Sequence, residues 1–581
     1  MVLLRILQIE HIMMSFTKIF NIVIILFFFS HLSFGQNPSI TITDIQKKEF
    51  RGVRPIINQV NEEVEGYYTL YVNEKVDNKQ SEFILAILDT ELKIIKQLSI
   101  AMDKKTTIQS AAYNGECFLF LFNGTPIASM DLNNRQNVYF GKYSLTLVTI
   151  SKKGEILGTK GIELKGRESQ ADSDAEAYAA MNDGFYIYRP RIVKAASIWG
   201  YSIEYVDNQL NTRWEKQFIP EKGFISAEAI ETIGDKLMII QLFKKKYMTA
   251  KADINLLAIN SQTGDTDYNY PLYTDEVTLL PSCFYAEKSG IVCSGIYAEG
   301  NTINGQAADG MFFLKLNNKG EKEQLSMVNW KDGLDDVLKS TKKTINLGSK
   351  PMVLFHKIIK SKEGQYQLIG ETYKVSAQTT MKAPTFLNSK RVIGDPYFRS
   401  SSTASHNNNS SSTTNGFPAV SNTQSQNPSR IWTVQDFVIF NFSEDGKITN
   451  INKIEKEHTS FTVYSYILKG CLTPSGMLQR LKERYVFDFA FSTKKKDSDQ
   501  EIIVSRNFAK AKPYIGMFSI DIEEVSKMNR IEIRNSLTTQ NKNSDEDFVG
   551  IMPAKPGYTC IYQYHPKERT INMYLEDIKL D

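Results

Sequence analysis

The chain has 581 residues, of which 42% are hydrophobic and 23% are charged, a composition typical of folded proteins and not of disordered or collagen-like chains. Its 69 Lys and Arg residues nearly balance its 65 Asp and Glu residues, so the net charge of +4 does not favour nucleic acid, an anionic membrane or an acidic substrate as a partner. The 28 Tyr and 33 Phe residues, together with many Ile, Val and Thr residues, favour strands. We expect an all-β protein.

The amino end has the order of charged, apolar and small residues that is typical of an export signal. Lys18 precedes a run over residues 19–29 that is apolar except for Asn21, and the small residues Ser33 and Gly35 follow at the expected cleavage site. This order predicts a signal peptide over residues 1–35, with Gln36 as the first residue of the mature chain. A membrane anchor is the less favoured alternative, because the run is shorter than the ~20 residues that span a bilayer. We expect an exported protein, periplasmic or secreted, with no transmembrane segment after signal removal.

Export makes disulfides possible, and two cysteines lie close together in the sequence. Cys283 and Cys293 flank a predicted hairpin turn at residues 287–290. They would form a disulfide if the register of the hairpin placed them opposite each other. The alternative is that both thiols are buried as small apolar side chains. The odd total of five cysteines leaves at least one thiol unpaired.

Two kinds of turn alternate along the mature chain, each between short strands rich in aromatic and β-branched residues. Turns of the first kind contain Gly66, Gly115, Gly184, Gly234, Gly290, Gly364, a polar turn at Asp499, and Gly557. Turns of the second kind are polar segments that end a strand, at residues 89–92, 151–154, 207–210, 261–264, 317–320, 443–446 and 523–525.

The spacing of these turns indicates a repeated unit. From each turn of the first kind to the next of the second kind, the separations are 26, 39, 26, 30, 30, 82 and 26 residues. Five of the seven agree within four residues, so the pattern is one unit with two insertions. Each unit is predicted to be a four-stranded antiparallel meander, and such sheets arranged radially form a β-propeller. We predict a single β-propeller over residues 36–581.

The last unit lacks a fourth strand. Residues 548–553, 558–564 and 570–578 supply three predicted strands, after which the chain ends. Residues 39–45 form a strand-like segment that precedes the first complete unit and belongs to none. We predict that this segment pairs with the carboxyl-terminal strands, closes the ring and covers an exposed sheet edge. This count gives eight blades, with seven blades or two stacked smaller propellers as alternatives.

The long connections are all predicted at one end of the sheets. In a four-stranded meander, the loops between strands two and three lie at the same end as the links between blades. Long connections of both kinds are expected there, at residues 123–142, 166–175, 329–349, 373–430 and 457–483. Because function on repeat scaffolds tends to lie in the elaborated loops, we expect this face to be the binding surface.

Four aromatic side chains are candidates for that surface. Trp199 and Trp330 lie in predicted links, where they would stack on a sugar or anchor a protein partner, although packing in the core is the alternative. Tyr397 and Phe398 lie in a segment that would fold over the face as a lid, although a disordered insertion with no specific role is the favoured alternative. The neighbouring residues 400–429 are nearly all Ser, Thr, Asn and Gln, which predicts a flexible low-complexity insertion.

Motifs for catalysis or cofactor binding are not found in the sequence. The mature chain has four dispersed histidines, at positions 356, 406, 458 and 565, and no spacing typical of a zinc site. It contains no nucleophile elbow, phosphate-binding glycine loop or dinucleotide fingerprint. We therefore expect no metal, no cofactor and no enzymatic activity.

The predicted export signal, followed by glycine turns and aromatic strands over nearly all of residues 36–581, resembles uncharacterised secreted β-propeller-like proteins of Gram-negative bacteria. The resemblance implies no activity, because fold alone does not supply one. Our first hypothesis is an exported, non-catalytic scaffold that presents the long-loop face to a protein or an envelope glycan. The alternative is a carboxylate-dependent enzyme acting on glycans, with its site at the central tunnel.

Overall fold

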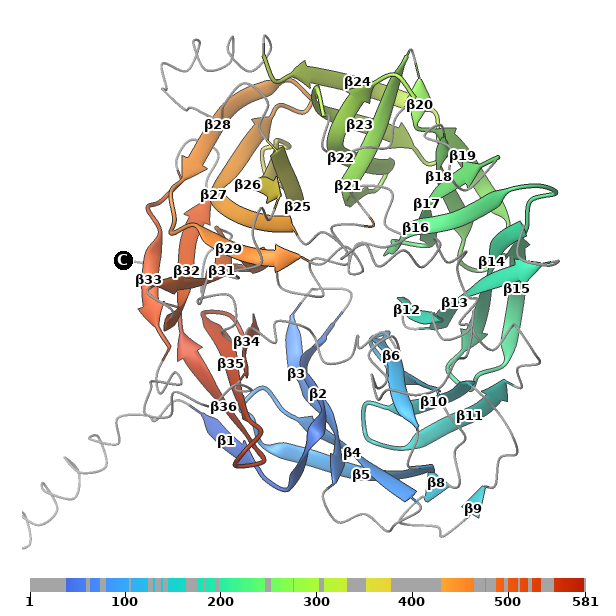
Figure 1. The fold of residues 1–581 in the computed structure, drawn as a ribbon, viewed down its shortest axis with the longest axis vertical. Helices are drawn as coiled ribbons and strands as arrows, with labels where there is room; N and C mark the ends of the chain where they lie inside the picture. Colours follow the sequence, from blue (N-terminus) through green and yellow to red (C-terminus); the bar gives the residue numbers. More distant parts are fainter. Residues whose placement is uncertain are drawn as a thin grey trace, which may run out of the picture.

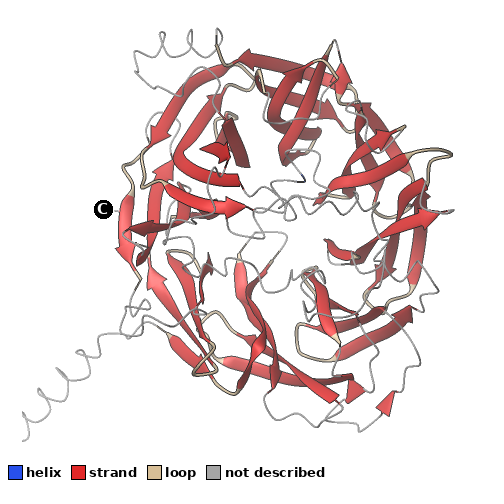
Figure 2. Ribbon diagram, viewed as in Figure 1, coloured by secondary structure: helices blue, strands red, loops and turns tan. Residues whose placement is uncertain are grey.

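In a computed structural model of the chain, the structure describes residues 38–58, 63–73, 80–103, 106–123, 129–130, 137–138, 145–162, 175–181, 183–193, 198–245, 252–274, 276–301, 308–331, 352–377, 430–463, 476, 487–495, 500–509, 512–520, 525–533 and 548–578. The predicted signal peptide and the low-complexity insertion lie outside these residues. The described elements are β-strands (Figure 2), so the all-β prediction is confirmed.

The strands form eight antiparallel units, named here units one to eight in chain order. Unit one consists of β2 (Ile45–Ile57), β3 (Val64–Asn73), β4 (Gln80–Leu88) and β5 (Ile94–Asp103), and unit two consists of β6 (Thr107–Tyr113), β7 (Cys117–Asn123), β10 (Leu145–Ser151) and β11 (Ile156–Ile162). Unit three consists of β12 (Glu176–Ala180), β13 (Gly184–Val193), β14 (Ile198–Asp207) and β15 (Thr212–Phe218), and unit four consists of β16 (Phe224–Ile233), β17 (Lys236–Lys244), β18 (Asp253–Asn260) and β19 (Thr266–Pro271).

Unit five consists of β21 (Val277–Glu287), β22 (Gly290–Glu299), β23 (Gly310–Asn317) and β24 (Lys322–Asn329), and unit six consists of β25 (Met352–Lys360), β26 (Tyr366–Ala377), β27 (Arg430–Phe442) and β28 (Ile448–Ile454). Unit seven consists of β30 (Phe489–Lys494), β31 (Glu501–Ala509), β32 (Lys512–Ile520) and β33 (Asn529–Glu532), and unit eight consists of β34 (Phe548–Pro553), β35 (Tyr558–His565), β36 (Thr570–Asp577) and β1 (Ser39–Ile42). Four short strands are additional: β8 (Ser129–Met130), β9 (Asn137–Val138), β20 (Tyr273–Thr274) and β29 (Thr459–Val463).

The units follow one another around a ring, with the first strand of each near the middle and the fourth at the rim (Figure 1). Units three and four share one sheet, because Trp199 of β14 and Phe224 of β16 form a parallel bridge. Within each unit, successive strands pair antiparallel, as the meander prediction required.

The fourth strand of unit eight comes from the amino end of the chain. β1 pairs antiparallel with β36, and Ser39 lies opposite Tyr574 while Ile42 lies opposite Ile571. Ile42 is 4% exposed and belongs to a hydrophobic cluster with residues of units one and eight. The predicted pairing of residues 39–45 with the carboxyl-terminal strands is therefore confirmed for residues 39–42.

The hydrophobic core lies between neighbouring units. Buried clusters join units one and two, two and three, three and four, six and seven, and seven and eight, while the largest cluster joins units four, five and six. A further cluster joins unit eight to unit one. Each unit thus packs against the unit before and the unit after it.

This packing explains why the middle strands are apolar on both faces. β7 has the sequence Cys-Phe-Leu-Phe-Leu-Phe-Asn, and the side chains from Cys117 to Phe122 are buried, because units one and three cover its two faces. The rim strand β15 instead alternates exposed and half-buried residues. Charged side chains on such edge strands disfavour pairing with another molecule.

Three of the repeated turn glycines are explained by a close approach of two strands. A Cβ atom added to Gly290, at the start of β22, would lie 1.9 Å from the carbonyl oxygen of Leu316 in β23. Gly66 and Gly184 occupy equivalent positions, with carbonyl oxygens 2.2 Å and 2.1 Å from the added atom. Real Cβ atoms do not approach an oxygen so closely, so only glycine fits without a backbone shift.

We therefore predict that Gly290→Ala lowers the free energy of unfolding by on the order of 3 kcal/mol, because the backbone must move to admit the methyl group. Gly300→Ala is the control. Gly300 has a φ of 72° and no atom within 4 Å of an added Cβ, so only the left-handed backbone penalty of about 1 to 2 kcal/mol applies. Urea denaturation of the two variants measures the difference, and equal losses would contradict the steric explanation.

Several turns of the second kind are held by their first side chain. Asp89 Oδ1 accepts hydrogen bonds from the backbone N–H groups of Glu91 (2.9 Å) and Lys93 (2.8 Å). Asp207 makes the same two bonds to residues 209 and 211. This side chain to backbone bonding is the reason why Asp, Asn and Ser recur at the first position of these turns.

Candidate functional site

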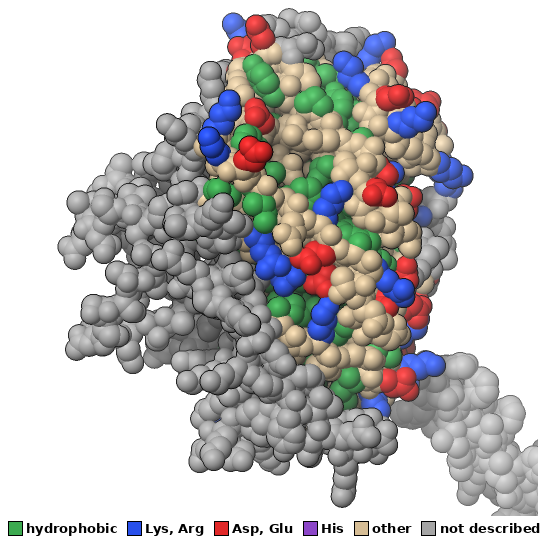
Figure 3. Space-filling view, turned by 90° about the vertical axis from the view of Figure 1, so that its right-hand side faces the viewer, with side chains coloured by type: hydrophobic (Ala, Val, Ile, Leu, Met, Phe, Trp, Pro, Cys, Tyr) green, Lys and Arg blue, Asp and Glu red, His purple; other side chains and the backbone are tan. Residues whose placement is uncertain are grey.

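The two ends of the ring differ in their connections. The connections between strands one and two and between strands three and four of a unit lie at one end, which we call the tight-turn face because those that the structure describes in full are short turns. Unit eight has only the first of these connections, because its fourth strand, β1, comes from the amino end. The connections at the other end, which we call the long-connection face, include those between β7 and β10, β11 and β12, β24 and β25, β26 and β27, and β29 and β30. The rim between the two faces carries positive and negative side chains intermixed in the view of Figure 3.

Trp330 is part of the core and not of a surface. It is 3% exposed, belongs to the cluster that joins units four to six, and has its ring centroid 6.3 Å from that of Phe440 in β27. The hypothesis that Trp330 anchors a partner is therefore corrected: the residue follows β24 directly, and its ring turns inward to fill space between sheets. A change at this position would disturb packing before it disturbed binding.

Trp199 is half-buried in β14, opposite Ile192 of β13. Its backbone N–H donates to the carbonyl oxygen of Gly223 (3.2 Å), at the junction of units three and four. Its position near the long-connection face keeps it as a candidate for that face. Tyr397 and Phe398 lie outside the described residues.

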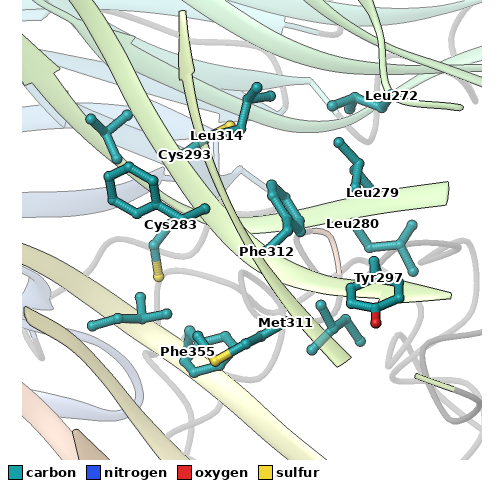
Figure 4. Packing of buried hydrophobic residues seen from close by; sticks show 14 of the residues in the cluster. Leu272, Leu279, Leu280, Cys283, Cys293, Tyr297, Met311, Phe312, Leu314 and Phe355 are labelled. Atoms are coloured by element: carbon teal, nitrogen blue, oxygen red, sulfur yellow. The ribbon is translucent and has the colours of Figure 1, made fainter. Parts of the chain in front are cut away.

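Cys283 and Cys293 do not form the predicted disulfide. Cys283 lies opposite Ser294, and Cys293 lies opposite Phe284. The hairpin has a two-residue loop between Glu287 and Gly290, so directly opposed residues are separated by odd numbers of positions. The two cysteines are separated by an even number and point to opposite faces of the sheet. Both are buried, and Figure 4 shows them in different parts of one hydrophobic cluster.

A group of ionisable and polar side chains is buried between units six and seven, near the long-connection face. It consists of His356 in β25, Glu371 in β26, Lys456 just after β28, Thr459 in β29, and Asp488 just before β30, and we call it the buried ionic cluster. The side chains of His356, Glu371 and Lys456 are 0% exposed, and that of Asp488 is 3% exposed.

Glu371 is at the centre of the cluster. His356 Nε2 lies 3.0 Å from Oε2, and Lys456 Nζ lies 3.1 Å from Oε1. The backbone N–H groups of Asp488 and Phe489 also donate to Oε2, at 3.1 Å each. Lys456 Nζ lies 2.5 Å from Asp488 Oδ2 and so connects the two carboxylates. These contacts bring together residues that are more than a hundred positions apart in the sequence.

The electrostatics of the cluster keep Glu371 and Lys456 charged. Burial alone would raise the pKa of Glu371, but the Lys456 ammonium, His356 and the Phe489 N–H group hold that pKa below its ordinary value. Burial alone would likewise lower the pKa of Lys456, but Asp488 and Glu371 hold it above its ordinary value. A buried ion pair with these hydrogen bonds is costly to break by removing one partner.

This arrangement suits a structural joint better than acid–base chemistry. A catalytic carboxylic acid needs a pKa raised towards neutrality and access to its substrate. Glu371 has a lowered pKa and no exposed surface. The two carboxylates are close together, and both pair with the same ammonium group, that of Lys456.

Smaller ion pairs join other neighbouring units. Lys160 of β11 lies 2.7 Å from Glu204 of β14, between units two and three. Lys360 of β25 pairs with Glu287 of β21, between units five and six. In both cases the carboxylate is largely buried, and its pKa is held below the ordinary value by the lysine despite the opposing effect of burial. Inter-unit ion pairs are thus a recurrent feature, and the buried ionic cluster is the most enclosed of those described above.

Among the described residues, no three His, Cys, Asp or Glu side chains are placed to hold a metal ion. In the same part of the chain, no helix has the length and apolar character that a membrane span requires. The sequence-based predictions include His356 only as one of four dispersed histidines and do not include Glu371, Lys456 or Asp488. The available signal was a charged residue within an apolar strand, as in Met352–Lys360 and Tyr366–Ala377.

Solved structures with a detectable likeness differ from one another in function. A eukaryotic initiation factor is 8% identical over 93% of this chain and 96% of its own, with a TM-score of 0.35. A post-proline cleaving enzyme from Rickettsia typhi is 11% identical over 90% of this chain and 58% of its own, with a TM-score of 0.35. Cobalt-substituted Synechocystis ACO is 9% identical over 48% of this chain and 64% of its own, with a TM-score of 0.27. The chain covers less than two thirds of the length of the last two proteins. TM-scores this low give no basis for assigning an activity to the chain.

No curated protein matches the chain. A family model described as "Family of unknown function (DUF6770)" matches residues 14–404 and 407–579, which is most of the sequence. The expected resemblance to an uncharacterised protein family is therefore confirmed. The chain belongs to the family of unknown function DUF6770.

Proposed function

We propose that the eight units form one closed, eight-bladed β-propeller. The support is a continuous path of packing, in which each unit shares a hydrophobic cluster with the next and unit eight shares one with unit one. The pairing of β1 with β36 places the first and last strands of the chain in the same blade. In propellers, such a composite blade resists opening of the ring, because separating two blades would also break a sheet.

We propose that the protein is an exported, non-catalytic scaffold that presents the long-connection face to a protein or an envelope glycan. The observation that carries this proposal is the difference in length between the connections at the two faces. The turns of the tight-turn face are short and repeated, as the Asp89 and Asp207 turns are, whereas the connection between β26 and β27 alone covers residues 378–429. Elaborated loops on one face of a repeat scaffold are the usual place for binding.

The alternative is an enzyme that uses carboxylates of the central tunnel to act on glycans. The observation against it is the state of Glu371 and Asp488, which are enclosed and paired with Lys456. A glycosidase needs two carboxyl groups on either side of a bound sugar, and at least one must donate a proton. The charged state of Glu371 opposes that role.

A capture experiment from bacterial envelope extract tests the scaffold proposal. One variant carries three charge reversals on exposed residues of the long-connection face: Lys331→Glu, Lys374→Glu and Glu455→Lys. The matched control carries Lys153→Glu, Lys319→Glu and Glu363→Lys, all exposed on the tight-turn face. A third variant lacks residues 400–429.

We expect the mature protein to retain a defined protein or glycan, and the first variant to bind it at least about tenfold more weakly, while the control changes affinity by less than about twofold. Equal weakening by both charge-reversal variants would contradict the assignment of the face. Hydrolysis of a glycan by the wild type, abolished by Glu371→Gln, would support the enzyme instead.

A further inference from the structure

Three side chains of the buried ionic cluster meet at the amino nitrogen of Lys456. This nitrogen lies 2.5 Å from Asp488 Oδ2 and 3.1 Å from Glu371 Oε1. The hydroxyl group of Thr459 donates to the same Asp488 oxygen at 3.2 Å. A lysine nitrogen, a carboxyl group that it could attack and a second carboxylate that could carry a proton are therefore in contact. These are the groups that a lysine and an aspartate need in order to condense to an amide.

Backbone hydrogen bonds hold the two reacting residues in place. The N–H group of Lys456 donates to Asp436 Oδ1 at 3.2 Å. The N–H group of Asp488 donates to Glu371 Oε2 at 3.1 Å, and its carbonyl oxygen accepts from the N–H group of Arg506 at 2.7 Å. Two reactants that are held in contact no longer have to find each other, and such positioning raises the rate of a reaction by orders of magnitude.

The contact between Lys456 and Asp488 is enclosed by the protein. The two side chains are 0% and 3% exposed. The amino nitrogen of Lys456 lies 5.4 Å from the centroid of the Phe437 ring, and Phe489, the next residue after Asp488, stacks on His356 at 4.9 Å. Excluding water from a reaction site prevents hydrolysis of what forms there, so this enclosure favours an amide once it has formed.

Burial also favours the proton transfer with which the condensation begins. Burial alone raises the pKa of Glu371 and lowers that of Lys456, and the opposite charges around each group keep both charged. Moving one proton from the ammonium group to Glu371 removes two buried charges at once. The neutral amine that remains lies beside the Asp488 carboxyl group, and a neutral amine is a nucleophile.

We propose that Lys456 and Asp488 form an isopeptide bond after the chain has folded. The Lys456 nitrogen attacks the Asp488 carboxyl carbon, so that one C–N bond forms and one C–O bond breaks. The leaving oxygen takes up the proton that Glu371 carries and a second proton from the attacking nitrogen, and it departs as water. One ammonium group and one carboxylate thus become one amide and one water, and Glu371 returns to its first state. Glu371 is the catalytic residue of a reaction that takes place once in each molecule.

The bond would tie unit six to unit seven at the long-connection face. Lys456 follows β28, the last strand of unit six, and Asp488 precedes β30, the first strand of unit seven. The bond therefore closes a covalent loop over the connection between these two units, and a cross-link of this kind stabilises a protein mainly by restricting its unfolded chain. The ion pair described above is the state before the bond forms. This inference does not rest on the proposed binding function.

Two other ion pairs between units serve as internal controls. Lys160 lies 2.7 Å from Glu204, and Lys360 pairs with Glu287. The two lysine side chains are 30% and 26% exposed, so water reaches their ammonium groups and stabilises the charged form. We expect no amide at either pair.

Mass spectrometry of proteolytic peptides from the folded wild-type protein tests the proposal. We expect a branched peptide that joins Lys456 to Asp488 in most molecules, lighter by one water than the sum of its two parts. We expect no branched peptide from Lys160 or Lys360. If Lys456 and Asp488 were recovered only in separate, unmodified peptides, the proposal would be overturned. This result does not depend on whether any variant folds.

Matched variants test the roles of the individual groups. Lys456→Arg keeps the positive charge and should form no bond, whereas Lys453→Arg should form the bond as the wild type does, because Lys453 pairs with Asp436 at 3.0 Å outside the reacting group. Glu371→Gln keeps the size of the side chain but cannot carry the proton, so the bonded fraction should fall at least about tenfold. Equal bonded fractions in Glu371→Gln and the wild type would overturn the proposed proton transfer.

Discussion

We expect Lys456→Met to lower the free energy of unfolding by about 3 to 5 kcal/mol, the usual cost of removing one partner from a buried ion pair. Methionine retains most of the apolar side chain, so the loss reports the charge and not a cavity. Without the ammonium, the buried carboxylates of Glu371 and Asp488 would both lose the cation that lies between them.

Lys447→Met is the matched control for this prediction. Lys447 pairs with Asp445 at 2.8 Å, but its side chain is 79% exposed, and exposed pairs contribute little to stability. Urea denaturation at neutral pH measures both variants. We expect the control to be indistinguishable from the wild type. A change of less than about 1 kcal/mol for Lys456→Met would show that the cluster does not hold the joint.

The second large effect concerns the amino-terminal strand. We expect a chain that lacks residues 36–43 to lose more stability than Ile42→Ala alone, which should cost about 2 to 5 kcal/mol for a buried isoleucine. The truncation also exposes β36 as a sheet edge and removes the hydrogen bond from Leu575 N–H to the carbonyl oxygen of Pro38 (3.0 Å). Thr41→Ala, at an exposed position of the same strand, should change stability by less than about 0.5 kcal/mol.

Thermal unfolding of the truncated protein measures this effect, and an engineered disulfide checks the register. Thr41 lies directly opposite Asn572, so cysteines at these two positions should form a bond on oxidation. Cysteines at positions 43 and 572 should not. A truncated chain as stable as the full one would mean that β1 does not hold unit eight.

The repeated architecture could be predicted from the sequence because its signals are local. A turn glycine such as Gly290 is required by a strand that passes 1.9 Å from where its Cβ would lie, and an Asp such as Asp89 caps its own turn. Each signal depends on contacts within a single unit, so the eight units and the composite last unit could be predicted from the spacing of the turns. The predicted strand at residues 548–553 has the same bounds as β34.

The side-chain predictions were less successful because they depend on how strands face one another. The cysteines would be opposed only in a hairpin with an odd number of loop residues, whereas the loop between Glu287 and Gly290 has two. Trp330 follows a strand, and only the packing of unit six against unit five determines that its ring turns inward. The buried ionic cluster assembles residues 356 and 488, and no local pattern connects them.

Photo-cross-linking to the captured partner tests the central claim, that the long-connection face is the binding surface. A photoreactive amino acid is placed at Lys331, Lys374 or Glu455 on that face, and at Gln262, Lys319 or Glu363 on the tight-turn face, all exposed positions. We predict cross-links from at least one position of the first set and from none of the second. Cross-links confined to the tight-turn face would contradict the account.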